Sequence, residues 1–405
     1  MYKLIIGSVV LIAGNTVLAQ KYNPAIYQNV ADVNNDGKIT EDDIDAVRKA
    51  INFNDLKYDV NKDGIVNIFD FVIVKNNLGW KRPDIEISSF DDLLAFSILT
   101  RQLKELDWKI QLTDNIVFNK RVVGPRLYGK TVSIEGNNKT IDMTAQDFQH
   151  GMTTSLNVTN GIDILATKKF TIRNVTIQGF DGGGSAIKLY VGDSPSGFGG
   201  GVGSSKIVNV TFRNIGDKEH PFFTAEPITI SYDCWCSQPI GGISPILTVM
   251  DCTFDRCCLN NFYAHCVYVK GDQLFFMGNK TIKSGHPIKF TYQNLDAPQN
   301  RTVITGNEFN LSPVRFRTSE KKLPAIWLPY QPITAAHNVI TWEKDNQWHG
   351  DAPLWDRNVN AYQHSLYIYN TYIGDMNIKW WYLPHAGKPI SIENWKKIES
   401  TSTWK

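Results

Sequence analysis

The chain has 405 residues, which is enough for one small and one large domain, and its 42 basic and 40 acidic side chains give a formal net charge of +2. Proteins that bind nucleic acid neutralise phosphates with clustered Lys and Arg, and no polybasic run occurs here. Composition therefore argues against a nucleic-acid partner.

Residues 1–19 have the pattern of a secretory signal peptide. Lys3 precedes an apolar run from Leu4 to Ile12, and Val17-Leu-Ala19 forms a small-residue site before Gln20. The run is shorter than the roughly 20 apolar residues that a membrane-spanning helix needs, and no later stretch approaches that length. We expect no membrane span and a secreted protein that is extracellular or held at the cell surface by a partner, with residues 20–30 as a linker.

Two twelve-residue segments, loop 1 (Asp32–Asp43) and loop 2 (Asp59–Asp70), repeat 27 positions apart with oxygen donors in the same places. A loop of the EF-hand type binds Ca²⁺ through positions 1, 3, 5, 7, 9 and 12, with a glycine at position 6 for the turn. Gly37 and Gly64 occupy position 6. The predicted ligands of two Ca²⁺ ions are Asp32, Asn34, Asp36, the Lys38 carbonyl, Thr40 and Asp43 in loop 1, and Asp59, Asn61, Asp63, the Ile65 carbonyl, Asn67 and Asp70 in loop 2.

Each loop leads into one short apolar-periodic helix, and there is no room for a helix before either loop. This pattern, over residues 31–80, resembles a type I dockerin, the calcium-binding module that docks enzymes onto cohesin domains of a scaffold protein, as in the cellulosome. The resemblance implies a cohesin partner that is selected by loop positions 10 and 11. These positions hold Glu41-Asp42 in loop 1 and Ile68-Phe69 in loop 2. We therefore expect one dominant docking mode, through the apolar Ile68/Phe69 side.

After residue 84 the sequence predicts one amphipathic helix, residues 89–103, capped by Ser88 or Ser89, and then strands. A unit of Asn or Asp followed by Thr and an apolar residue recurs every 28 to 42 residues, and a strand of strict alternation lies between successive copies. The copies begin at Asn138, Asn174, Asn209, Asp251, Asn279, Asn307, Asn338 and Asn370. Such rungs bury their apolar faces only by stacking on one another, and Asn at the turns is expected to form an internal ladder.

This arrangement resembles a right-handed parallel β-helix of the pectate-lyase type. The predicted fold is mainly β, preceded by the small all-α dockerin. In chain order the predicted parts are residues 1–19 (signal peptide), 20–30 (linker), 31–80 (dockerin), 81–105 (linker and capping helix), 106–375 (β-helix solenoid) and 376–405 (C-terminal cap).

Alternation assigns the faces of the strands that lie between the Asn units. Residues such as Ile187, Leu189, Val267 and Ile288 are expected to point into the solenoid, as are Leu366 and Ile368. The outward column is Lys188, Thr229, Tyr268, Lys289, Trp327 and Tyr367, and a second column two positions before the first inward residues is Ser185, Glu226, His265, His286, Pro324 and His364.

Two neighbouring rungs, His265-Cys-Val-Tyr268 and His286-Pro-Ile-Lys289, have identical spacing, so their four polar side chains are the predicted catalytic residues. Like-charge repulsion among them favours a neutral base near pH 7, which suits proton abstraction at C5 of a uronic acid. Neutralising the substrate carboxylate needs a cation, supplied by a lysine, an arginine or a further Ca²⁺. The predicted substrate-binding residues are Lys188, Glu226, Arg315, Arg317, Trp327, His364 and Tyr367.

The expected function is β-elimination of an anionic, uronic-acid-containing polysaccharide, as in polysaccharide lyases. Uronate epimerisation fits the same residues. Glycoside hydrolysis on a β-helix needs carboxylates facing the cleft, of which the columns offer only Glu226. A non-catalytic carbohydrate-binding or adhesive role remains a third hypothesis.

The six cysteines all lie between Cys234 and Cys266, and an even number in an exported chain allows disulfides in fifteen complete pairings.

Overall fold

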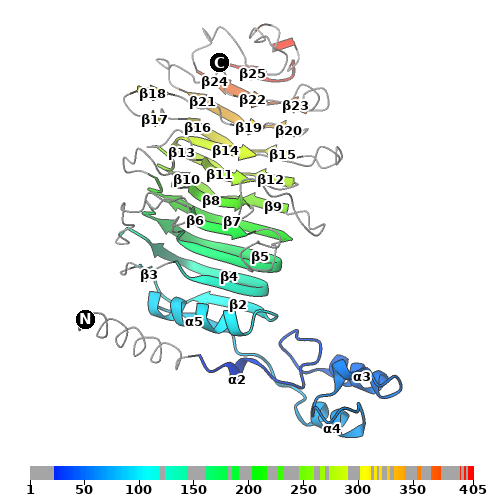
Figure 1. Ribbon diagram of the computed structural model, residues 1–405. Helices are drawn as coiled ribbons and strands as arrows, with labels where there is room; N and C mark the ends of the chain where they lie inside the picture. Colours follow the sequence, from blue (N-terminus) through cyan, green and yellow to red (C-terminus); the bar gives the residue numbers. More distant parts are fainter. Residues whose placement is uncertain are drawn as a thin grey trace, which may run out of the picture.

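A computed structural model (Figure 1) describes residues 22–118, 124–144, 160–180, 185–190, 203–216, 226–231, 246–259, 265–269, 273–290, 302–311, 314–316, 319–321, 326–328, 333–342, 354–356, 366–374, 393, 396–397 and 400–405. At residues 167, 226–227, 229–231, 286, 289–290, 314–316, 319–321, 326–328 and 354–356 it describes the backbone only. The described chain is mainly β, with a large parallel sheet and few helices. The predicted signal peptide, residues 1–19, lies outside these residues.

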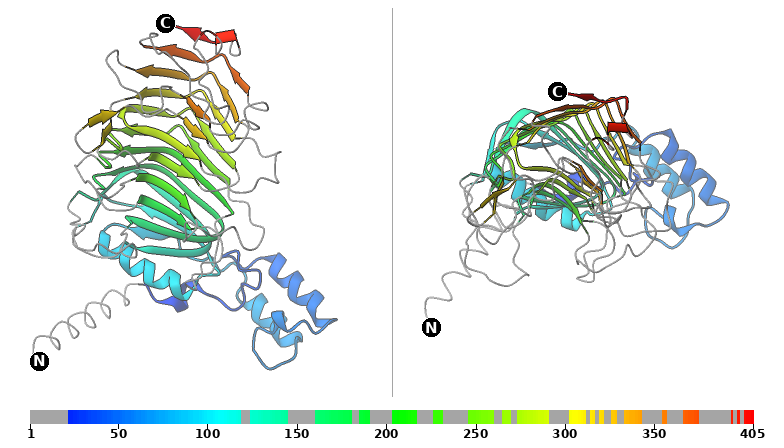
Figure 2. Two further views of the ribbon diagram at one scale, coloured as in Figure 1. Left: turned by 45° about the horizontal axis from the view of Figure 1, so that its top comes forward. Right: turned by 90° about the horizontal axis from the view of Figure 1, so that it is seen from above.

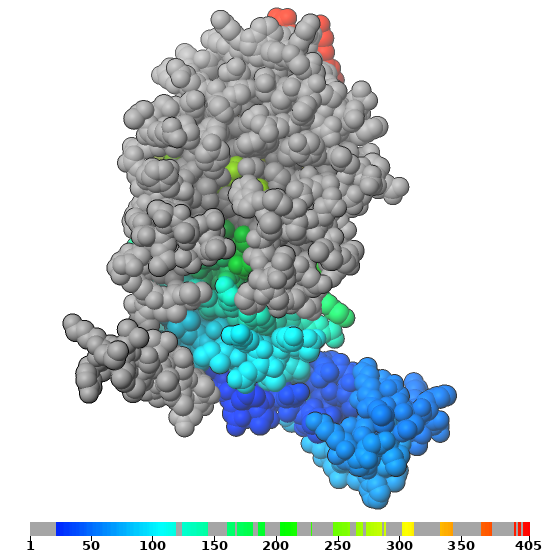
Figure 3. Space-filling view, viewed as in Figure 1, coloured from blue at the N-terminus to red at the C-terminus, as the bar shows by residue number. Residues whose placement is uncertain are grey.

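The helical part comes first along the chain. Its elements are α2 (Pro24–Tyr27), α3 (Glu41–Ile51), the 3₁₀ turn η1 (Leu56–Tyr58) and α4 (Ile68–Asn76). Helices α3 and α4 pack on a small apolar core of their own that includes Ile44, Val47, Val66 and Val74. Helices α3 and α4, with loop 1 and loop 2, form a lobe beside the lower end of the sheet, drawn in blue in Figures 1 and 3 and called the helical lobe below.

The stretch around α2, which the sequence predicts as a linker, packs against the β part instead. The Tyr22 ring lies 5.9 Å from that of Phe96, and the Tyr27 ring lies 6.1 Å from that of Trp108. Tyr22 and Tyr27 belong to the same buried cluster as the sheet residues. The chain is therefore anchored on the β part just before it enters the helical lobe.

The helix predicted at residues 89–103 is present as α5 (Phe90–Gln102). The Ser89 side chain accepts from the Asp92 amide and caps the helix. Phe90, Phe96 and Leu99 of α5 are buried in the core that contains Trp108. Helix α5 thus lies against the first strands, at the lower end of the sheet in Figure 1.

The strands form three stacks in which each strand pairs in parallel with its equivalent one coil later. Stack 1 contains β6 (Ser185–Tyr190), β8 (Glu226–Ser231), β11 (His265–Val269), β14 (His286–Phe290), β19 (Ile326–Leu328) and β22 (Leu354–Asp356). Stack 2 contains β1 (Ile85–Ile87), β2 (Asp107–Leu112), β9 (Ile246–Met250), β12 (Gln273–Met277), β15 (Thr302–Thr305), β20 (Ile333–Ala336) and β23 (Leu366–Ile368). Stack 3 contains β3 (Ile116–Val117), β10 (Thr253–Asp255), β13 (Lys280–Ser284), β16 (Glu308–Leu311), β21 (Val339–Trp342), β24 (Thr371–Ile373) and β25 (Thr403–Trp404).

Three longer strands continue from one stack into the next: β4 (Arg126–Asp142), β5 (Ile162–Gln178) and β7 (Ser204–Arg213). A short hairpin, β17 (Val314–Phe316) and β18 (Ser319–Lys321), pairs antiparallel beside the stacks. Seen along the stacks, successive coils superpose (Figure 2, right). This arrangement is consistent with the predicted parallel solenoid, but within the described residues most coils contribute three strands, whereas the sequence predicted two. The stack 2 strands β9, β12, β15 and β20 are among those that were not predicted.

The interior of the coils is filled by side chains that repeat from coil to coil. Phe212 and Phe254 are register partners, and their rings stack with centroids 5.2 Å apart. Phe276 of stack 2 stacks on Phe309 of stack 3 at 6.0 Å. Ile187, Leu189, Val267 and Ile288, predicted to point inward, are fully buried. Buried side chains at inward positions of successive coils thus form a continuous core.

A ladder of buried asparagines marks the turn between stack 2 and stack 3. Asn279, Asn307, Asn338 and Asn370 each hydrogen-bond the next, as the sequence predicted. The alignment of the copies was wrong by one residue at Asn279, because the register pairs Lys280 with Thr253 and so places Asn279 beside Cys252. Asn209 and Asp251 have left-handed backbone in the two preceding coils, and in this coil the residue at the same position is Gly278, with φ of 64°.

Candidate functional site

Loop 1 and loop 2 have the same backbone geometry. Position 4 is left-handed in both, with φ of 58° at Asn35 and 59° at Lys62. Position 6 is left-handed as well, with φ of 88° at Gly37 and 89° at Gly64. Because only glycine adopts this conformation without steric cost, the glycines allow the sharp turn on which both loops depend.

The first aspartate of each loop holds the turn together. In loop 1 the Asp32 carboxylate accepts from the Asp36 amide at 3.1 Å and from the Gly37 amide at 3.0 Å. In loop 2 Asp59 accepts from the equivalent amides of Asp63 and Gly64, at 3.2 and 2.7 Å. The two segments therefore share one hydrogen-bond scheme as well as one sequence pattern.

The last aspartate of each loop connects the loop to its helix. The Asp43 carboxylate accepts from the Thr40 amide at 2.9 Å and completes a capping box at the start of α3. Asp70 does the same for Asn67 at the start of α4, at 2.8 Å, and also accepts from the Val60 amide. The aspartate at position 12 thus ties each loop to the first turn of the helix that follows it.

The donor set suits calcium, which prefers carboxylate, amide and carbonyl oxygens in a flexible shell. Among the described residues, no group of three His, Cys, Asp or Glu side chains is arranged to hold a metal ion. In both loops the carboxylates instead accept hydrogen bonds from loop amides. The other predicted ligands are Asn34, the Lys38 carbonyl and Thr40 in loop 1, and Asn61, the Ile65 carbonyl and Asn67 in loop 2. The assignment of two calcium ions to these loops remains a prediction.

The two loops differ in their electrostatic surroundings. Asp32 is buried and pairs with Arg82, with Oδ2 3.3 Å from Nη2. Burial raises the pKa of the Asp32 carboxyl, an effect that Arg82 opposes and the nearby Asp36 and Asp43 reinforce. Asp63 in loop 2 is exposed, and a hydrogen bond from Asn61, the largest cause, lowers its pKa.

The loop 2 side of the lobe exposes apolar side chains. Ile68 is 58% exposed and Phe69 66% exposed, and Ile65 and Val72 beside them are exposed as well. At loop 1 the equivalent positions, Glu41 and Asp42, are exposed and acidic. The predicted difference between the two sides is therefore present on the surface.

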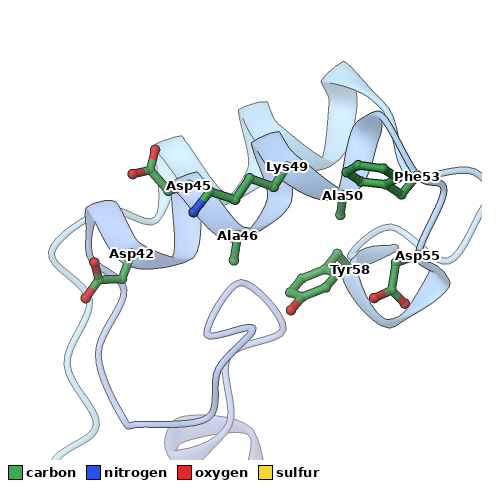
Figure 4. Close-up of a pocket in the computed structure, with 8 residues that line it drawn as sticks. All are labelled: Asp42, Asp45, Ala46, Lys49, Ala50, Phe53, Asp55 and Tyr58. Carbon is green, nitrogen blue, oxygen red and sulfur yellow. The ribbon is translucent and has the colours of Figure 1, made fainter.

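A hollow of about 530 Å³ lies on the loop 1 side of the lobe (Figure 4). Helix α3 contributes Asp42, Asp45 and Lys49 to one wall, and Asp55 and Tyr58 from the η1 turn approach from below. Arg48 already pairs with Asp45, so part of the acidic charge is compensated within the helix. The remaining lining residues are Ala46, Ala50 and Phe53.

On the β part, the register confirms most of the predicted alignment of the column in stack 1. Lys188 pairs with Thr229, Thr229 with Tyr268, Tyr268 with Lys289 and Lys289 with Trp327. In the second column Ser185 pairs with Glu226, and His265 pairs with His286. The four predicted catalytic residues therefore lie at paired positions on two adjacent strands.

His265 and Tyr268 are less accessible than a solvent-facing column implies. His265 is 1% exposed and Tyr268 9%, and their ring centroids lie 5.9 Å apart. The backbones of His286 and Lys289 lie on β14, and their side chains are outside the described residues. The structure thus brings the His265 and Tyr268 side chains close together in a buried position.

Tyr367 does not belong to the outward column. It pairs with Ala335 in stack 2, and it is buried while Leu366 is 43% exposed, which reverses the predicted faces. The register partner of Trp327 is instead Trp355. The sequence assigned β23 to the wrong stack because its alternation is the same as that of the stack 1 strands.

The other predicted substrate-binding residues are placed in part. Lys188 is half-buried, with its Nζ 5.6 Å from the centre of the Tyr190 ring. Glu226, Arg315 and Trp327 are placed by backbone only, on β8, β17 and β19. Arg317 and His364, together with Pro324 of the second column, lie outside the described residues.

The register also extends this column to residues that the sequence did not single out, of which Asp163 is buried. Arg126 pairs with Asp163, and Asp163 pairs with Lys188. The Arg126 Nε lies 3.1 Å from Asp163 Oδ2, and Asn160 donates to Asp163 Oδ1 at 2.8 Å. The sequence did contain a sign of this coil, because the alternation Ile162-Asp-Ile164 matches the alternation Ile187-Lys-Leu189 of β6.

The described cysteines are core residues. Cys252, Cys257, Cys258 and Cys266 are buried thiols, and Cys234 and Cys236 lie outside the described residues. Burial raises the pKa of the Cys252 thiol to about 12. The sequence allowed disulfides among the six cysteines. The four that are described contribute small apolar side chains to the core of the coils.

No family model matches the chain, and neither a curated protein nor a solved structure matches it. Within the described part of the chain, no helix is both long enough and apolar enough to cross a membrane.

Proposed function

We propose that residues 31–80 are a dockerin that binds two calcium ions and attaches a secreted protein to a cohesin-bearing scaffold. The observation that carries this proposal is the single hydrogen-bond scheme shared by loop 1 and loop 2, with left-handed backbone at positions 4 and 6 of each. One chance turn rich in Asp and Asn would not repeat it. The exposed Ile68 and Phe69 supply an apolar contact for the cohesin.

Calorimetric titration of the full chain with Ca²⁺ tests the calcium sites. We expect two bound ions, with one lost in Asp36→Ala and one in Asp63→Ala. These residues occupy position 5 of each loop and are exposed, so neither substitution disturbs the core. Absence of calcium binding by the unaltered chain would refute the assignment.

For the β part we propose a right-handed parallel β-helix that is closed at its start by α5 and acts on an acidic polysaccharide by β-elimination. The pairing of His265 with His286 and of Tyr268 with Lys289 supports this, since it sets two imidazoles, a phenol and an ammonium on neighbouring strands. A neutral imidazole would take the proton from C5 of a uronate while lysine neutralises the carboxylate. The C5–H electrons would form the C4–C5 double bond as the C4–O bond breaks, and the departing oxygen would take a proton.

The test is incubation of the full chain with pectate, alginate and chondroitin. We expect an ultraviolet-absorbing unsaturated product from at least one of them, abolished in His286→Ala and in Lys289→Ala. Lys206→Ala is the matched control, because Lys206 is an exposed lysine on β7, a strand outside stack 1. New reducing ends without that absorbance would indicate hydrolysis instead.

A non-catalytic carbohydrate-binding role is the second candidate, and the burial of His265 and Tyr268 favours it because a general base must reach its substrate. It predicts that a polysaccharide is retained by the chain without any product and that His265→Ala leaves this binding unchanged.

A further inference from the structure

Arg82 connects loop 1 to the β part of the molecule. The residue is 8% exposed, and its guanidinium donates in three directions. Nε bonds the Tyr27 carbonyl at 2.9 Å, Nη1 bonds the Asp107 carbonyl of β2 at 2.9 Å, and Nη2 bonds Asp32 Oδ2 at 3.3 Å. The first predicted calcium ligand therefore shares a buried cation with the edge of the sheet.

The backbone reinforces this connection. The Arg82 amide donates to the Gly37 carbonyl at 2.8 Å, and the Ile39 amide donates to the Trp80 carbonyl at 2.9 Å. Gly37 also packs closely on Arg82, since a Cβ added there would lie 3.3 Å from Nη1. The middle of loop 1 is thus paired with the segment that leads out of the lobe.

Loop 2 has no equivalent connection within the described part of the chain. A Cβ added at Gly64 would meet no atom within 4 Å, and Asp59 is only half-buried where Asp32 is buried. Two loops with one internal geometry therefore have different neighbours. Loop 1 faces the junction with the sheet, and loop 2 faces solvent.

The carboxylates of loop 1 gather around one turn. Asp32 accepts from the Asp36 amide and Asp43 accepts from the Asn34 amide, so a divalent cation held among these side chains would offset the repulsion between their charges. Asp32 Oδ2 accepts from the Gly37 amide and from Arg82, whereas Oδ1 accepts only from the Asp36 amide among the residues that the structure describes. Calcium held by Oδ1 would fix the carboxylate without displacing Arg82, as an outer-shell partner does in metal sites.

We propose that calcium in loop 1, acting through Arg82, fixes the helical lobe against the sheet, whereas calcium in loop 2 stabilises only the lobe. This inference rests on the calcium binding proposed above. Because the coupling is reciprocal, the closed junction also raises the affinity of loop 1 for calcium. Arg82 is a positioning residue in this scheme and needs no contact with the ion.

Amide hydrogen exchange of the full chain, followed by mass spectrometry, tests the proposal. The informative peptides cover residues 22–28 and 106–110, which contact Arg82 or pack beside it but contain no loop residue. In saturating calcium we expect Asp36→Ala, which leaves only loop 2 filled, to exchange about tenfold faster in these peptides, as loss of a charged hydrogen bond predicts. Asp63→Ala, which leaves loop 1 filled, should match the unaltered chain.

Arg82→Met supplies the second arm. With both ions bound, it should raise exchange in the same peptides to the level of Asp36→Ala, and Arg82→Lys should give an intermediate value. Equal exchange in Asp36→Ala and Asp63→Ala would overturn the proposal. So would an Arg82→Met variant in which adding calcium still slows exchange in these peptides as much as it does in the unaltered chain. If Arg82→Met does not fold, the two loop variants still decide, because they leave Arg82 in place. The calorimetric titration reports separately whether the loops bind calcium at all.

Discussion

Asn279 donates two hydrogen bonds to the same atom of Asn307. Its backbone amide lies 2.8 Å and its side-chain amide 3.1 Å from Asn307 Oδ1. The Asn307 side chain in turn donates to Asn338 Oδ1 and to the Phe276 carbonyl, both at 2.9 Å. Each asparagine therefore satisfies buried polar groups of the coil before it and the coil after it.

We predict that Asn307→Ala lowers the free energy of unfolding by about 3 kcal/mol, because it leaves several buried donors and acceptors without partners. Asn310→Ala is the control: this side chain is exposed on β16, so its loss should change stability by no more than about 0.5 kcal/mol. Urea titration measures both. Equal midpoints for the two variants would show that the ladder adds nothing to stability.

Cys252 should be protected from alkylation in the folded protein. Burial raises the pKa of its thiol from the ordinary 9.0 to about 12, so near pH 8 its thiolate should be about a thousandfold rarer than that of an unperturbed thiol. Mass spectrometry after iodoacetamide treatment, with and without urea, should find Cys252 modified only in the unfolded sample. Equal modification in both samples would contradict the prediction.

Because of Asp163, we expect the free energy of unfolding to fall as the pH rises above 3.8, the ordinary pKa of an aspartate side chain. Burial raises the pKa of this carboxyl above 3.8 although Arg126 opposes the shift. Burial prevails because the Asp163 side chain is 4% exposed, whereas that of Arg126 is 38% exposed and partly screened by water. Just above pH 3.8 the folded chain keeps a proton that the unfolded chain releases, so rising pH favours unfolding until Asp163 is ionised in both states.

Asp163→Asn lacks this titration and serves as the comparison. The unfolding free energy of the unaltered chain minus that of the variant should decrease as the pH rises above 3.8, as measured by denaturant titration at each pH. A difference that increases over this range would mean that the Arg126 ion pair outweighs burial.

Ile68→Asp combined with Phe69→Asp should abolish docking without affecting folding. Both side chains are more than half exposed, so we expect a change in unfolding free energy within about 0.5 kcal/mol per site. Affinity for a cohesin, measured by calorimetry, should fall at least about tenfold if these residues anchor the contact. Charge reversal at Glu41 and Asp42 is the matched control and should leave affinity nearly unchanged. An equal loss from both pairs would indicate two docking modes.

Strand alternation predicted much of the face of stack 1, because side chains in a strand must point to opposite sides. That rule placed Lys188, Thr229, Tyr268, Lys289 and Trp327 in one column, as the register confirms. The rule says nothing about which stack a strand joins. Tyr367 was therefore misplaced, although its strand has the expected pattern.

The one-residue error at Asn279 has a similar origin. The sequence Asn-Lys-Thr-Ile fits the repeated unit, but in the structure Thr281 takes the buried position of Phe254, and Gly278 takes the left-handed turn. A local motif cannot show which of two adjacent residues pairs with the coil before it. The connection of Arg82 to Asp32 was likewise invisible in the sequence, because fifty residues separate the two.

The anchoring of Tyr22 and Tyr27 on the β part has a consequence for proteolysis. The chain enters the helical lobe from a buried position beside Phe96 and Trp108, and it leaves the lobe through Arg82 to the same end of the sheet. The lobe is therefore an insertion with two fixed ends and not a tail on one flexible linker. A protease that cut only the exit segment near residue 84 would leave both fragments associated, so shedding the lobe from the sheet requires a second cut or unfolding of the junction.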